Sequence, residues 1–136
     1  MPTQLFVNLP VKDLGRTMKF FADLGFGFNE RFTGENAACL VISDTISAML
    51  LAEPFFRTFT DKQIVDTRSS TEAILALALD SRARVDEIAD KALAAGGQPS
   101  QPTQDHGFMY TRSFQDVDGH LWEVFHMDPS KFPASA

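Results

Sequence analysis

The chain opens with a strict alternation of side chains between Gln4 and Val11. Side chains of a strand point to alternate faces, so this pattern predicts a strand with one face in a core. The core face carries Leu5, Val7, Leu9 and Val11. Asp13 then stands at an N-cap position, and Gly25 at the end of a predicted helix whose apolar residues are Leu14, Met18 and Phe21.

Three more strands are expected in the first half of the chain. Residues 27–41 contain a strand, a polar turn near 33–36 and the start of a second strand that ends at Ile42, and Ile46–Leu51 forms the third. Residues 52–71 depart from any regular pattern. Within them, Thr60 and Gln63 have the spacing of a capping box and predict a short helix.

The second half repeats the order of the first. Leu75, Leu77 and Leu79 alternate with smaller residues, Asp80 and Ser81 are candidate caps, and a helix is predicted over residues 82–95. Two glycines end this helix, and strands are expected over residues 107–114 and 121–125.

This repetition is an internal duplication, which decides the fold class. We expect an α+β fold in which two βαβββ modules form a curved eight-stranded sheet around a concave cup, with the helices outside. Residues 1–136 then form a single domain, with module one at about 4–52, a link at 53–70 and module two at about 71–127.

A turn and a strand with one unusual charge close the second module. Asp116, Asp118 and Gly119 are typical turn residues, and the strand after them places Leu121, Glu123 and Phe125 on one face. A carboxylate between two bulky apolar neighbours needs water, a partner, a metal or a ligand. A plain surface glutamate on a half-exposed sheet is the alternative.

Composition narrows the class of partner. The chain has 12 Lys and Arg against 18 Asp and Glu, a net charge of −6, and no basic run, so we expect no nucleic-acid partner and no anionic membrane. No apolar run is long enough for a membrane span, and no signal segment is recognisable. A single cysteine, Cys39, fits a reducing cytoplasm. We expect a cytoplasmic protein with a small-molecule ligand.

The pattern Asp-x-Asp-Gly-x-x-x-Glu at residues 116–123, closing a duplicated chain, resembles the vicinal oxygen chelate superfamily. This superfamily includes glyoxalases, bleomycin-resistance proteins and extradiol dioxygenases, and the resemblance covers Leu5 to Met127. It implies that metal and substrate bind in the cup and that the chain forms a homodimer. It also makes Glu123 the counterpart of a metal ligand.

The same resemblance implies four metal-ligating positions, one on the first and one on the last strand of each module. The family pattern that ends here in Asp13 places Phe6 on the first strand, and the corresponding stretch of module two places Ile74. On the last strands the positions are those of Met49 and Glu123, because Asp44 aligns with Asp118. Phe and Ile have no donor atom, and a thioether is a poor ligand for hard or borderline divalent ions. We therefore expect no cofactor and no usual metal centre. A divalent metal held by Glu123 with His106 in a rearranged site is the alternative.

Side-chain parity gives the residues expected to line the cup. Asn8 and Glu123 are its polar groups, and the predicted ligand-binding set is Phe6, Asn8, Met49, Leu51, Ile74, Leu121, Glu123 and Phe125. Filling of a core without any ligand is the alternative. Arg112 is a further candidate, for an anionic substrate group, with an ion pair to an acidic neighbour as its alternative. His120 and His126 fall on the Trp122 face, away from Glu123.

These residues favour metal-independent binding of a small, partly apolar molecule, similar to the bleomycin-resistance branch. The second hypothesis is an enzyme, either a lyase or isomerase that resembles lactoylglutathione lyase or a dioxygenase, with Glu123 as catalytic base or sole remaining ligand. A protein–protein module that uses the Phe-rich link is the third. The sequence does not identify the ligand.

Overall fold

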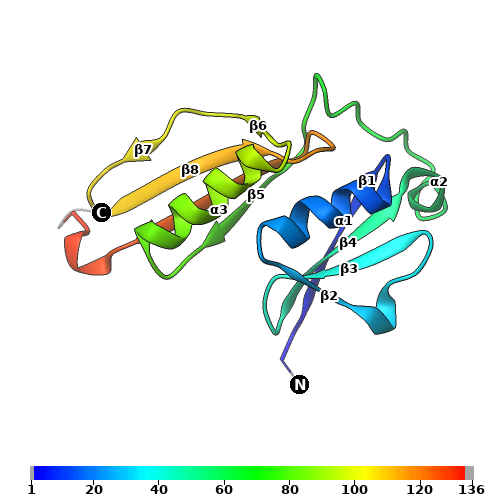
Figure 1. Ribbon diagram of the computed structural model, residues 1–136, viewed down its shortest axis with the longest axis horizontal. Coiled ribbons are helices and arrows are strands. Elements are labelled where there is room, and N and C mark those ends of the chain that lie inside the picture. Colours follow the sequence, from blue (N-terminus) through cyan, green and yellow to red (C-terminus); the bar gives the residue numbers. More distant parts are fainter. Residues whose placement is uncertain (1, 134–136) are drawn as a thin grey trace. The chain divides into compact units, whose positions relative to one another are not determined.

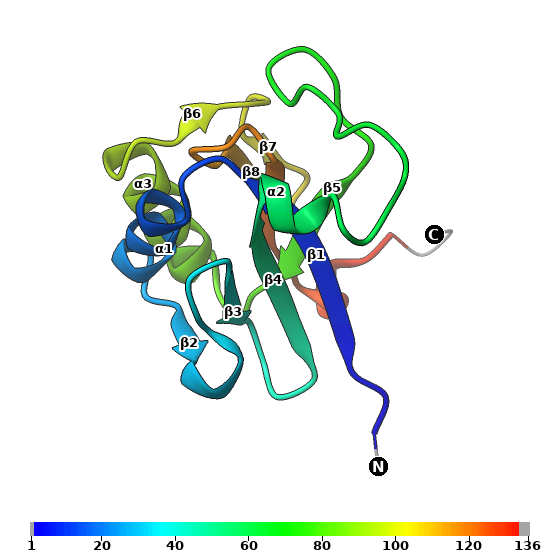
Figure 2. The same ribbon diagram turned by 90° about the vertical axis from the view of Figure 1, so that its right-hand side faces the viewer.

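The computed structural model describes residues 2–133 and divides into two compact units, residues 1–66 and 67–136 (Figures 1 and 2). Each unit holds one βαβββ module, so the predicted α+β class and the two modules are confirmed. The predictions of a single domain, one continuous curved sheet and a shared cup remain predictions.

In the first unit, one helix covers one side of a four-stranded sheet (Figure 1). The strand order is β1-β4-β3-β2, with β1 and β4 parallel and the other pairs antiparallel. The elements of the module are β1 (Leu5–Val11), α1 (Leu14–Asp23), β2 (Gly27–Asn29), β3 (Ala37–Val41) and β4 (Ile46–Ala52). A short 3-10 helix, Glu30–Phe32, follows β2, and α2 (Glu53–Phe56) follows β4.

The predicted alternation explains how β1 packs. Leu9 and Val11 are buried, whereas the intervening Asn8 is exposed. The predicted N-cap is also present, because the Asp13 carboxylate accepts a hydrogen bond from the Arg16 N–H at 3.1 Å. The helix then buries Phe20 and its neighbours against the sheet, and the fully buried apolar residues of this core include Phe20, Phe21, Ala48 and Leu50.

The second unit repeats this plan with two extra short strands. Its sheet has the order β5-β9-β8-β6, with β7 also paired to β8. The elements are β5 (Ile74–Ala78), α3 (Arg82–Ala94), β6 (Gln98–Pro99), β7 (Gln104–Asp105), β8 (Met109–Gln115), β9 (Leu121–Met127) and a 3-10 helix at Pro129–Lys131. The helix α3 covers one side of this sheet (Figure 1). We call the side of each sheet away from its helix the far face.

The register of the paired strands allows the two modules to be aligned residue by residue. Asn8 pairs with Met49 in the first sheet, and Ala76 pairs with Glu123 in the second. The antiparallel pairs agree in their spacing, because Met49 pairs with Cys39 and Glu123 pairs with Ser113, so 49 − 39 equals 123 − 113. The alignment of Met49 with Glu123 therefore follows from backbone pairing as well as from the turn residues.

Two predictions about local structure are wrong. Residues 60–66 form no helix; instead the Thr60 hydroxyl accepts a hydrogen bond from the Lys62 N–H at 3.1 Å within a loop. The helix of this region is α2, seven residues earlier, where Pro54 occupies the first turn. The strands β6 and β7 were not predicted, since each is only two residues long. Among residues 2–133, no helix is long and apolar enough to cross a membrane.

Candidate functional site

The start of β9 is fixed by a buried carboxylate. Asp116 is 3% exposed, and its Oδ1 accepts hydrogen bonds from the backbone N–H groups of Asp118 at 2.9 Å and His120 at 3.0 Å. Its Oδ2 accepts the indole N–H of Trp122, also at 2.9 Å. Burial raises the pKa of the Asp116 carboxyl, and the His120 imidazole and the Trp122 N–H oppose this effect. The turn and the first residues of the strand are thereby held together.

Gly119 completes this turn in a conformation that a side chain would strain. Its φ is +86°, and a Cβ at this position would lie 2.9 Å from the backbone oxygen of Thr67. The Thr67 hydroxyl also donates a hydrogen bond to the Asp118 carbonyl oxygen. The close approach of Thr67 anchors the segment before β5 to the turn before β9.

Glu123 lies on the far face of the second sheet, as parity predicts. Trp122 and Val124 are buried on the α3 side, whereas Glu123 is half-buried between Ala76 of β5 and Ser113 of β8. The Glu123 carboxylate makes no hydrogen bond or ion pair with any residue that the structure describes. The other predicted residues of this face, Ile74, Leu121 and Phe125, are beside it in register.

Among the described residues of β5, β8 and β9, none places a cation on the far face around Glu123. By register, β5 contributes small or apolar residues, and β8 contributes polar but uncharged ones between Met109 and Gln115. The residues of β5 and β8 on this face are Ile74, Ala76, Ala78, Met109, Thr111, Ser113 and Gln115. Within these three strands, Glu123 is thus the one charged residue of the far face, and its strand neighbours there are apolar or neutral.

Arg112 lies on the opposite side of the same sheet. It pairs in register with Val124, and its guanidinium contacts Asp86 at 3.1 Å and Asp90 at 2.7 Å, both on α3. The Tyr110 hydroxyl donates to Asp86 at 2.6 Å, which lowers the pKa of that carboxyl and raises the pKa of Tyr110. The structure therefore places Arg112 in the ion pair that the sequence left as its alternative, and not beside Glu123.

The far face of the first sheet gathers the remaining predicted residues. Phe6 and Asn8 of β1 share it with Met49 and Leu51 of β4, as their register requires. Phe6 is 47% exposed, whereas Leu51 is 2% exposed. Met49 occupies the position that Glu123 has in the second sheet, so the first far face offers a thioether where the second offers a carboxylate.

The residues present do not fit the metal centre that the family resemblance implies. Within residues 2–133, no group of three or more His, Cys, Asp and Glu side chains is arranged to hold a metal ion. His106 lies next to β8, where its backbone N–H donates to the Met109 carbonyl oxygen. Its ring stacks on Phe108, with centroids 6.2 Å apart. Met109 pairs with Met127, four residues along β9 from Glu123, or about 13 Å. The structure does not bring His106 to Glu123.

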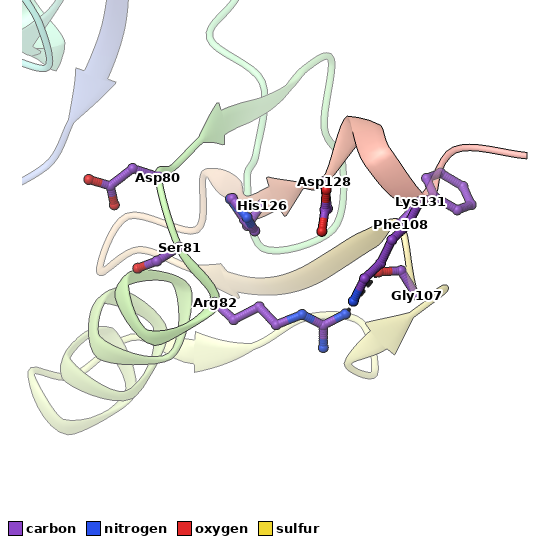
Figure 3. A pocket seen from close by; sticks show the side chains of 8 residues that line it. All are labelled: Asp80, Ser81, Arg82, Gly107, Phe108, His126, Asp128 and Lys131. Atoms are coloured by element: carbon purple, nitrogen blue, oxygen red, sulfur yellow. Dashed lines mark hydrogen bonds between the residues drawn. The ribbon is translucent and has the colours of Figure 1, made fainter.

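The second unit contains a cavity that the sequence did not predict (Figure 3). Its volume is about 270 Å³, and it is lined by Asp80, Ser81, Arg82, Gly107, Phe108, His126, Asp128 and Lys131. The sequence indicated only the cap: the Ser81 hydroxyl accepts the Arg84 N–H at 3.0 Å at the start of α3. The other lining residues come from separate segments, and no spacing in the sequence connects them.

The fold and the register define a duplicated βαβββ protein with one carboxylate on its last strand. A family model, the Glyoxalase/Bleomycin resistance protein/Dioxygenase superfamily, matches residues 3–124. The chain belongs to this superfamily, and the resemblance to the vicinal oxygen chelate proteins is confirmed. A search of the curated proteins finds no match.

Solved structures show the same fold at low sequence identity. A hypothetical protein from S. aureus has a TM-score of 0.78 at 23% identity, over 93% of this chain and 94% of that one. The bleomycin resistance determinant encoded on transposon Tn5 has a TM-score of 0.65 at 21% identity, over 93% and 99%. The fosfomycin resistance protein FosX from Mesorhizobium loti has 0.69 at 14%, over 96% and 97%.

Proposed function

We propose that this protein binds a small, partly apolar molecule on the far face of its second sheet, beside Glu123, without a metal ion. The observation that carries the proposal is the half-buried carboxylate of Glu123, which has no partner among the described residues and is surrounded by Leu121, Phe125 and small side chains. Taking a carboxylate partly out of water costs free energy, which a bound hydrogen-bond donor or cation offsets. The apolar neighbours provide the contact area for the rest of the ligand.

The absence of suitable ligands at the matching positions supports binding without a metal. Glu123 has Ala76 and Ser113 as its cross-strand neighbours, and Met49 replaces the carboxylate in the first module. A single carboxylate does not retain a divalent ion in water, because Mg²⁺, Ca²⁺ and Zn²⁺ sites need several ligands. Of the four positions at which the family resemblance implies a metal ligand, Glu123 is the one with a carboxylate in this chain.

A glyoxalase-type lyase is the second candidate, because Glu123 keeps its place in the pattern that the resemblance identifies. In that case Glu123 acts as a base that takes a proton from the substrate, and its carboxylate oxygen must lie within about 3 Å of that proton's carbon or oxygen. Turnover of a 2-oxoaldehyde adduct of a thiol distinguishes this activity from binding alone.

We also propose a cytoplasmic homodimer, an assignment that rests on the resemblance and on the single buried thiol of Cys39. Light scattering coupled to size-exclusion chromatography measures the mass directly. A mass near twice 15.1 kDa is expected, and a mass near 15.1 kDa at micromolar concentration contradicts the dimer.

The test of the binding proposal is a charge-neutral substitution at Glu123. A library of small amphipathic molecules is screened by thermal shift, and the best ligand is titrated by calorimetry into the wild type and Glu123→Gln. Loss of a charge-assisted hydrogen bond is expected to weaken binding by about tenfold, or roughly 1.5 kcal/mol. The melting temperature without ligand is expected to change little, because the carboxylate has no partner to lose.

The matched control is Glu72→Gln, which removes the same charge from an exposed position before β5. Equal affinity in Glu123→Gln and the wild type contradicts a role for Glu123 in binding. Unfolding of Glu123→Gln, with Glu72→Gln intact, makes the carboxylate structural and also contradicts the proposal.

A further inference from the structure

The cavity of Figure 3 lies on the α3 side of the second sheet, so it is separate from the far face that carries Glu123. His126 lines it from β9, and this residue pairs with Tyr110, whose hydroxyl reaches Asp86 of α3. The remaining walls come from the turn before α3, the loop before β8 and the 3-10 helix after β9. A ligand in this cavity leaves the far face of the second sheet free.

Two sides of the cavity are held rigidly before any ligand binds. The Arg82 guanidinium forms a two-point ion pair with Asp105, at 2.7 and 2.9 Å, and also donates to the Gly107 carbonyl at 3.2 Å. It lies over the Tyr110 ring, 4.9 Å from the centroid. Phe108 is packed edge-on against Phe132, with centroids 5.7 Å apart. The positive charge of Arg82 is thereby paired, and the aromatic wall is fixed.

Three polar groups of the cavity keep binding capacity. The Nδ1 of His126 lies 2.9 Å from the Leu79 carbonyl, so this nitrogen carries the proton and Nε2 is left to accept or, when protonated, to donate. The ammonium group of Lys131 makes no hydrogen bond or close ion pair within the described part of the chain, and its charge acts on the nearby Asp128 carboxylate. Asp128 accepts the N–H of Ser130 at 3.1 Å and its hydroxyl at 2.6 Å through Oδ1, which leaves Oδ2.

The charges of Asp128 and Lys131 disfavour a ligand that carries only a positive or only a negative charge. The hydrogen bonds from Ser130 lower the pKa of the Asp128 carboxyl, so it stays ionised at neutral pH and repels a simple anion. Lys131 attracts an anion and repels a cation, whereas the nearby Asp128 does the reverse, so a ligand with a single charge is favoured by one group and disfavoured by the other. A molecule that carries both charges satisfies Asp128 and Lys131 at once.

We propose that this cavity binds a small zwitterion, with its ammonium group at Asp128 and its carboxylate at Lys131. The volume of about 270 Å³ equals the space of roughly nine water molecules. An amino acid with a short side chain fits within this volume, with its apolar part against Phe108. The Nε2 atom of His126 provides a further hydrogen bond to the polar end.

The test compares probes that share a three-carbon chain. Alanine and β-alanine carry both charges, propionate carries only the carboxylate, and propylamine carries only the ammonium. Each is titrated into ¹⁵N-labelled protein, and amide shifts are followed at Gly107 and Phe108. Saturable shifts with alanine or β-alanine, at least tenfold tighter than with either single-charge probe, are expected. No saturable shift with any probe, or equal affinity for propionate, overturns the proposal.

Two variants locate the binding in this cavity. Lys131→Met removes the ammonium and keeps the chain length, and Asp128→Ser removes the charge but keeps an oxygen that caps the 3-10 helix. Each is expected to weaken the zwitterion at least tenfold, whereas Lys91→Met on α3 has no effect. Unchanged affinity in both cavity variants overturns the assignment. Glu123→Gln is expected to leave this binding unchanged, so the two sites are tested independently.

Discussion

Asp116→Ala is expected to lower the free energy of unfolding of the second unit by about 3 kcal/mol, because three buried donors lose their acceptor. These donors are the N–H groups of Asp118, His120 and Trp122. Water does not replace the carboxylate easily, since Asp116 is 3% exposed and Trp122 is 2% exposed. Urea denaturation followed by fluorescence measures the effect, because Trp122 is the single tryptophan of the chain.

Two further variants calibrate this result. Asp116→Asn keeps an oxygen for the two backbone donors but turns an amide N–H₂ group toward the Trp122 N–H, so an intermediate loss is expected. Asp44 is the turn residue of the first module that aligns with Asp118, and its side chain is exposed. Asp44→Ala is therefore expected to change the free energy of unfolding by less than about 0.5 kcal/mol. A loss below about 1 kcal/mol for Asp116→Ala would mean that the carboxylate does not hold the turn.

Gly119→Ala is expected to cost roughly 2–3 kcal/mol, from the left-handed backbone and from the contact with Thr67. A Cβ at this position meets both the backbone oxygen and the hydroxyl oxygen of Thr67 at 2.9 Å. The first of these atoms belongs to the main chain, so relief requires a shift of the segment before β5. Chemical denaturation of the variant gives the magnitude.

Gly107→Ala separates the two causes. Gly107 has a φ of +82°, close to that of Gly119, but a Cβ there meets nothing within 4 Å. This variant is therefore expected to lose only the cost of the backbone conformation, about 1 kcal/mol. Equal losses in the two variants would show that the approach of Thr67 contributes nothing.

The sequence predicted the regular elements well because their patterns are local. Alternation identified β1, β5 and β9, and the caps at Asp13 and Ser81 located the starts of α1 and α3. The duplication also predicted that Met49 matches Glu123, which the strand pairing confirms. These features depend on neighbours within one strand or one helical turn, so a single sequence contains them.

Features that depend on pairing between distant segments were not predictable. The side of the sheet that Arg112 occupies follows from the pairing of β8 with β9 and from the position of α3. Neither feature can be predicted from the residues near position 112. The capping-box spacing of Thr60 and Gln63 predicted a helix that does not form, because such pairs also occur in loops. The cavity combines residues from Asp80 to Lys131 through tertiary packing alone.

The family resemblance implies four metal-ligating positions, and the superfamily includes both metal enzymes and binding proteins. In this chain one of the four positions holds a polar residue. That position is Glu123; the others hold Phe6, Met49 and Ile74, which lie on the far faces of the two sheets. Phe, Met and Ile at three of these positions are poor or impossible ligands for a hard or borderline metal ion, which favours the proposed binding without a metal. Membership of the superfamily and the proposed binding role are therefore consistent.

Metal content tests the central claim most directly. The protein is purified without chelator or affinity metal, its metals are measured by elemental analysis, and its melting temperature is recorded with added nickel, zinc, manganese and iron. We predict less than a stoichiometric amount of any metal and no metal-dependent rise in melting temperature, in the wild type and in Glu123→Gln alike. One metal per chain that raises the melting temperature of the wild type but not of Glu123→Gln would contradict metal-independent binding.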